Sequence, residues 1–367
     1  MIICNCTYFC ANYLYKQFLT STDRNLEISD GRGLLLLPSI NSSKGILHIP
    51  NTTEALILLD EIGHYSEFSD FLLCCQMLKN DEYELCKKLL LKLNANIGTP
   101  EPNNLDLYTS VCLKYLFMIL HELGHDYFYI EGEEDRKIWF SKINDAIDYI
   151  NTQDFENTDY SAYENRYHSE MPQMENPDYE GEVKKQLFEI KSFSDYFSKD
   201  QKRKKEEMAA DLFSMWMLRG CLQEMDWLKT EKQFMAYCKY VLNGLCLSTN
   251  ISILQRKMDE YEIAPSLTKN GKFNIARAMV ALYNLAAISG EDFEFDELYY
   301  NNILFDGIMN GARYMEKLIC EENMEYLNVT VNGSLNSYDE EKFRSCKQGI
   351  DDYVMNLRKT YFCFDND

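Results

Sequence analysis

Basic residues are in short supply in this chain. Its 367 residues include 37 Lys and Arg against 59 Asp and Glu, and the formal net charge is -22. A surface of this sign repels the phosphates of nucleic acids and the anionic headgroups of a membrane. We therefore expect neither nucleic acid nor a membrane among its partners.

Long apolar runs and C-x-x-C pairs are also missing, and we expect no secretory signal. The longest apolar candidate, Val111–Leu120, is about half the ~20 residues that cross a bilayer, and it contains Lys114. The first fifteen residues hold no basic residue, unlike the start of a secretory signal. The thirteen cysteines are odd in number and form no C-x-x-C pair, which favours reduced thiols and a cytoplasmic location.

The apolar pattern predicts a mainly α (α+β) protein. Apolar residues make up 46% of the chain, enough for a full core. Between turn residues, the runs Leu34–Leu37 and Ile46–Ile49 predict a small N-terminal β-element such as a hairpin. Helical periodicity dominates from Thr52 onward. It predicts helices over 53–62, 66–79, 81–94, 105–130, 134–150, 183–199, 201–222, 273–289, 293–324 and 338–357.

Differences in composition and apolar periodicity divide the chain into three consecutive segments. Residues 1–100 combine the β-element with helices, 101–225 hold the motifs described below, and 226–367 form a C-terminal helical region. The middle segment includes an acidic insert, 151–182, in which nine carboxylates stand against a single arginine. No repeat of 20–50 residues is present, which disfavours solenoid folds.

The segment His121–His125 reads H-E-x-x-H and follows an apolar run. Residues four apart share a helical face, so both imidazoles can reach one metal ion. Glu122 is displaced by about 100° around the helix and is suited to contact a water on the metal rather than the metal itself. A zinc ion lowers the pKa of its bound water to about 7, so Glu122 could take the proton as a general base.

A catalytic zinc site needs a third protein ligand and an open position. Histidine is scarce, because only His48, His64 and His168 remain outside the motif. A carboxylate is therefore the economical third ligand, and Glu207 is the best candidate.

Asp211 lies four residues after Glu207, on the same helical face. It could accept a hydrogen bond from the outer N–H of a histidine ligand and fix its tautomer. Ala209 and Ala210 between them are small enough for a second helix to pack closely. Taken alone, this segment also fits a solvated charge run, because four basic residues precede it.

The sequence also offers other candidates for the third metal ligand. A metzincin would have Gly and His at positions held here by Phe128 and Glu131, so the helix is expected to continue. Glu133 and Glu134 follow directly as weaker candidates. In the acidic insert, His168 could be a ligand, a group that steadies the developing oxyanion, or an exposed histidine without a role. Three tyrosines of the insert could steady the oxyanion as well: Tyr160, Tyr163 and Tyr167.

The pairing of H-E-x-x-H at 121–125 with E-x-x-A-D at 207–211 resembles the gluzincin metallopeptidases. Within them it is similar to the ImmA/IrrE-type regulatory proteases and the Lit-type phage-exclusion peptidases of bacteria. The resemblance covers about two helices. It implies a zincin-like helical core and a zinc endopeptidase with ligands His121, His125 and Glu207 and base Glu122. The C-terminal region carries no such resemblance.

We therefore expect a zinc-dependent intracellular protease, in a bacterial defence or regulatory system, that acts on a protein or peptide and takes a regulatory protein partner. The competing hypothesis is a non-catalytic protein-binding module in which the metal only holds two helices together. A purely structural zinc would be closed by a fourth ligand and would need no base, so Glu122 favours the enzyme.

Overall fold

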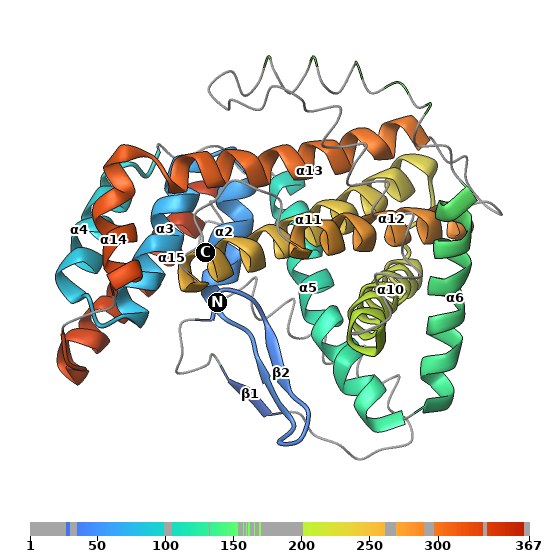
Figure 1. Ribbon diagram of the computed structural model, residues 1–367, viewed down its shortest axis with the longest axis horizontal. Helices are drawn as coiled ribbons and strands as arrows, with labels where there is room; N and C mark the ends of the chain where they lie inside the picture. The colour runs from blue at the N-terminus through green and yellow to red at the C-terminus, as the bar shows by residue number, and fades with distance from the viewer. Residues whose placement is uncertain are drawn as a thin grey trace. The chain divides into compact units, whose positions relative to one another are not determined.

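The computed structural model in Figure 1 describes residues 27–29, 35–98, 105–131, 133–152, 201–260, 269–289, 297–332 and 336–362, with single residues at 157, 159, 161, 165 and 169. The fold is mainly helical with one small sheet near the N-terminus, which confirms the predicted fold class. The strands are β1 (Glu27–Ser29), β2 (Ser39–Asn41) and β3 (Ile46–His48). The α-helices are α2 (Asn51–Glu61), α3 (Tyr65–Lys79), α4 (Tyr83–Ala95), α5 (Leu105–Glu131), α6 (Glu133–Thr152), α10 (Gln201–Glu224), α11 (Glu231–Glu260), α12 (Lys269–Ser289), α13 (Glu297–Leu318), α14 (Met324–Asn332) and α15 (Glu340–Phe362).

The sheet contains the predicted hairpin, but one of its strands lies elsewhere than expected. Strand β3 is central, antiparallel to β2 and parallel to β1. The run Leu34–Leu37 does not form a strand where it is described; β2 follows it, after Pro38. The carbonyls of Leu35 and Leu36 instead accept hydrogen bonds from the hydroxyls of Thr52 and Thr53 in α2. The apolar run therefore docks on the first turn of α2.

A second correction concerns the helix expected over 293–324. It ends at Leu318, and a 3₁₀ turn (Glu321–Asn323) and α14 follow as separate elements. Cys320 has an extended backbone with ψ 158°, which stops the helix. The side-chain amide of Asn323 donates to the carbonyl of Lys317, satisfying an acceptor in the last helical turn. The predicted helix 183–199 lies outside the described residues.

The chain folds into two compact units, each assembled from separate stretches of sequence. Unit 1 comprises Met1–Glu122, Leu247–Pro265 and Asn310–Asp367, and unit 2 comprises Leu123–Cys246 and Ser266–Met309. Helix α5 is continuous through the boundary after Glu122, so the helical spacing of its residues is kept there.

In unit 1, α2, α3, α4 and α15 pack on one another around a core of large apolar side chains. Lys114 of α5 is also buried there, at 1% exposure, and its ammonium binds the carboxylates of Asp60 and Glu61 at the end of α2. Burial alone lowers the pKa of Lys114, but the two carboxylates outweigh it and raise the pKa above its ordinary value. The ion pairs of Lys114 with Asp60 and Glu61 therefore link α5 to the end of α2.

In unit 2, α10 packs against α6 and α12. After its basic first turns α10 is apolar on nearly every side, and most of the side chains from Met208 to Leu218 are buried. Tyr127 of α5 stacks on Phe213 of α10 with ring centroids 5.2 Å apart, and Trp139 of α6 lies edge-on to the same ring at 6.1 Å. These contacts place α10 beside the C-terminal half of α5.

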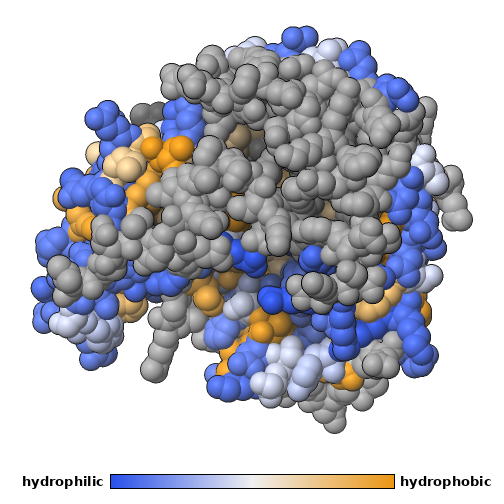
Figure 2. All heavy atoms as spheres, in the orientation of Figure 1, coloured by the Kyte–Doolittle hydropathy of each residue, from blue (hydrophilic) through white to orange (hydrophobic). Residues whose placement is uncertain are grey.

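On the face in Figure 2, the described residues are largely hydrophilic, with smaller hydrophobic areas between them. Within the described ranges, no helix combines the length and the apolar character needed to span a bilayer.

Candidate metal centre

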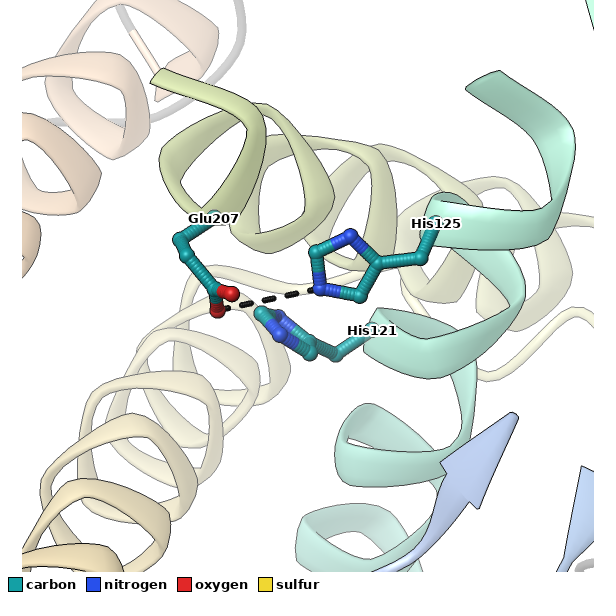
Figure 3. Close-up of side chains that lie close together, drawn as sticks. All are labelled: His121, His125 and Glu207. Carbon is teal, nitrogen blue, oxygen red and sulfur yellow. Dashed lines mark ion pairs between the residues drawn. The ribbon is translucent and has the colours of Figure 1, made fainter. Parts of the chain in front are cut away.

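Three side chains from two helices meet in Figure 3: His121 and His125 of α5, and Glu207 of α10. Each offers one ligand atom, and these atoms all lie within 4.8 Å of one another. The Nε2 atom of His125 is 3.7 Å from Oε2 of Glu207. The three residues are half-buried, so the cluster is neither sealed in the core nor fully exposed. The sequence prediction that these three side chains come together is confirmed.

The donor set suits a metal ion. Two imidazole nitrogens and one carboxylate oxygen are common ligands of zinc. Tetrahedral zinc with bonds of about 2.0–2.2 Å separates two ligand atoms by roughly 3.4 Å. The distance of 3.7 Å between His125 and Glu207 is close to that value. The cluster can therefore hold a metal ion with small side-chain adjustments.

The close approach of the two helices is made possible by Gly124, inside the motif. A Cβ atom added to Gly124 would lie 3.1 Å from the Cα of Ala210 and 3.1 Å from Cδ1 of Phe213. Ala209 and Ala210 are fully buried at this crossing. The expectation that small residues allow a second helix to pack closely is met at Gly124 and Ala210.

Gly124→Ala should therefore destabilise the protein, although alanine favours a helix over glycine by about 1 kcal/mol. Overpacking against a backbone atom costs about 1–3 kcal/mol, so we expect a net loss of about 1 kcal/mol in the free energy of unfolding. The measurement is chemical denaturation followed by circular dichroism. Gly220→Ala in α10 is the matched control, because nothing lies within 4 Å of its added Cβ, and it should be neutral or stabilising. A Gly124→Ala protein as stable as the Gly220→Ala protein would contradict the tight crossing.

Glu122 is half-buried and follows His121 directly on α5. Among the described residues, the cluster of possible metal ligands is His121, His125 and Glu207, without Glu122. This agrees with a role other than metal ligand, and its assignment as general base stays a prediction.

Asp211 contacts a residue that the sequence did not indicate. It is 2% exposed, and its two carboxylate oxygens accept hydrogen bonds from Nε and Nη2 of Arg277 in α12, each at 2.7 Å. The proposed contact from Asp211 to a histidine ligand stays a prediction, since a carboxylate can accept further hydrogen bonds. Arg277 is the single charged residue of 273–289, the apolar part of α12, and that pattern is the one signal that could have indicated it.

The alternative third ligands receive no support from the described residues. Helix α5 runs on to Glu131, as expected without a glycine turn. Glu134 is exposed and pairs with Lys137 at 2.6 Å. His48 in β3 and His64 before α3 are not part of the described cluster. The side chains of Glu131 and Glu133, together with His168 and the tyrosines Tyr160, Tyr163 and Tyr167, lie outside the described part of the chain.

Comparison with protein-family models, curated proteins and solved structures finds no match to this chain. The function must therefore be argued from the chemistry of the site itself.

Proposed function

We propose that this protein is a zinc-dependent peptidase whose metal ligands are His121, His125 and Glu207. The observation that carries the proposal is the meeting of these three side chains from α5 and α10, with Glu122 next to the first ligand. The resemblance of the two motifs to the gluzincins supports the same assignment.

The partial exposure of the candidate ligands supports a hydrolytic role, because water and substrate have to reach the metal. The side chains of His125 and Glu207 are 26% and 31% exposed, so both are partly open to water. Three protein ligands leave a position open, whereas a structural zinc site is normally closed by four. This favours the catalytic role over the alternative, a module in which the metal only holds two helices together.

A zinc ion held by His121, His125 and Glu207 would supply Lewis acidity, which would lower the pKa of a nearby water molecule and favour its attack on a peptide carbonyl. Glu122 accepts a proton from the attacking water and delivers it to the leaving amine. His121, His125 and Glu207 fix the position of that chemistry between the two helices.

The proposed substrate is a protein or peptide, and the proposed compartment is the reducing cytoplasm. The nine cysteines of the described residues are free thiols, which suits a reducing environment. A role in bacterial defence or regulation, with a regulatory protein partner, follows from the resemblance and is part of the proposal.

The direct test is cleavage of a denatured-protein and peptide library, followed by mass spectrometry. We expect peptide products that disappear when a chelator removes the metal and return when zinc is restored. The same chelator treatment should lower the melting temperature, because a ligand that binds only the folded protein stabilises it. Stoichiometric zinc without any cleavage would favour the helix-holding alternative, and cleavage that a chelator does not affect would contradict a metal mechanism.

A further inference from the structure

Arg277 and Asp211 form a buried ion pair that joins α12 to α10. The pair is bidentate, with both nitrogen–oxygen distances at 2.7 Å, and the side chains are 12% and 2% exposed. Two parallel N–H···O bonds from a planar guanidinium fix orientation as well as distance. The two bonds to Asp211 therefore restrict the rotation of α10 about its own axis.

Asp211 lies one helical turn after Glu207 on the same face of α10. Helix α10 is therefore held on two sides near the metal ligands. On one side Ala210 packs against Gly124 of α5, and on the other Asp211 binds Arg277 of α12. The carboxylate of Glu207 extends from this doubly held turn toward His125.

Small rotations of α10 would matter for metal binding. A turn of about 10° about the helix axis moves an atom that lies roughly 6 Å from the axis by about 1 Å. Metal–ligand distances, by contrast, are met within about 0.2 Å. The bond from Arg277 to Asp211 is therefore well placed to determine whether Glu207 reaches the metal.

We propose that Arg277 is a positioning residue for the metal centre: through Asp211 it sets the rotation of α10 and so the direction of Glu207. This inference rests on the proposed metal site and adds to it a residue from a third helix. It does not require Arg277 to touch metal, water or substrate.

The test uses the full chain and compares wild type with Arg277→Gln and Arg277→Lys. We expect Arg277→Gln to weaken zinc affinity about 10-fold in competition with a chromogenic chelator, the lower end of the range for losing a direct partner of a metal ligand, because Arg277 acts one contact further away. Arg277→Lys keeps the charge but not the two parallel bonds, so its loss should be smaller. The visible spectrum of the Co²⁺-loaded protein should change in Arg277→Gln, because the ligand arrangement changes.

A double variant gives a rescue. Arg277→Gln with Asp211→Asn leaves two neutral amides that can still hydrogen-bond to each other, without an unpaired buried charge. We expect it to recover part of the zinc affinity lost in Arg277→Gln alone. Arg344→Gln is the control, because Arg344 is exposed on α15 and pairs only with Glu340 of its own helix among the pairs described. It should bind zinc as wild type does.

The outcomes separate this inference from the proposed function. If wild type binds no zinc, the metal site and the proposed function fall together. If wild type binds zinc and Arg277→Gln has the same affinity and the same Co²⁺ spectrum, only the positioning role is overturned. A lower melting temperature of the metal-free variant with unchanged zinc affinity would likewise overturn it, because Arg277 would then support the fold alone. If Arg277→Gln does not fold, Arg277→Lys and the double variant take its place in the test. Wild-type zinc affinity in both would overturn the positioning role.

Discussion

Glu122→Gln is expected to lose nearly all peptide hydrolysis while keeping a wild-type content of zinc. Glutamine has the shape of glutamate but cannot accept the proton from the attacking water. General-base catalysis contributes about 10²–10⁴-fold, so we expect kcat to fall by about 10³-fold, or ~4 kcal/mol in the barrier. The metal ligands are untouched, and Glu122 lies outside the described ligand cluster. The measurement pairs kcat on a cleaved peptide with elemental analysis of the same protein.

Glu134→Gln is the matched control for this prediction. It makes the same chemical change on α6, where Glu134 is exposed and pairs with Lys137. Its activity should equal that of wild type. If Glu122→Gln cleaved the peptide as fast as Glu134→Gln does, the protein would not be a peptidase of this mechanism.

His125→Ala and Glu207→Ala are expected to reduce bound zinc from about one ion per chain to almost none. Each removes one of three ligands, and the two atoms they remove lie 3.7 Å apart in the structure. Two remaining ligands do not make a zinc site of either the structural or the catalytic kind. Elemental analysis after gel filtration gives the stoichiometry. Both variants should also lose the stabilisation that zinc gives to the folded wild type.

Two neighbouring substitutions control for general effects of losing a histidine or a glutamate. His64→Ala removes a half-buried histidine that pairs with Glu67, and Glu206→Ala removes the residue directly before Glu207. Both controls should keep zinc. Retention of a full equivalent in both His125→Ala and Glu207→Ala would show that the three-residue cluster is not the metal site.

The three candidate ligands could be predicted from sequence because their pattern depends on short-range regularity. The spacing of His121 and His125 follows from the helical repeat, and Glu207 was found through its own short pattern with Ala210 and Asp211. The structure confirms that the side chains of these three candidate ligands lie close together. The spacing of residues within one helix can be predicted without knowing how the helices are arranged.

Contacts between distant helices could not be predicted in this way. Nothing in the local pattern of α12 says that Arg277 meets Asp211, which lies 66 positions earlier. In the same way, Lys114 interrupts an apolar run, and only the fold shows that Asp60 compensates its charge. The run Leu34–Leu37 wrongly predicts a strand, because its apolar pattern is the same whether it pairs with a strand or packs on a helix.

The interleaving of the two units has a consequence for how the protein is made. Unit 1 needs Asn310–Asp367, which carries α15, the helix that packs against α2, α3 and α4. A chain emerging from the ribosome therefore cannot complete unit 1 until Asn310–Asp367 has been synthesised. Both segments of unit 2 come before Asn310 in the sequence. Unit 2 can therefore be completed sooner, once Ser266–Met309 has been made and α12 can pack on α10. Until that segment has been made, α2, α3 and α4 lack the helix α15 against which they pack in the folded unit.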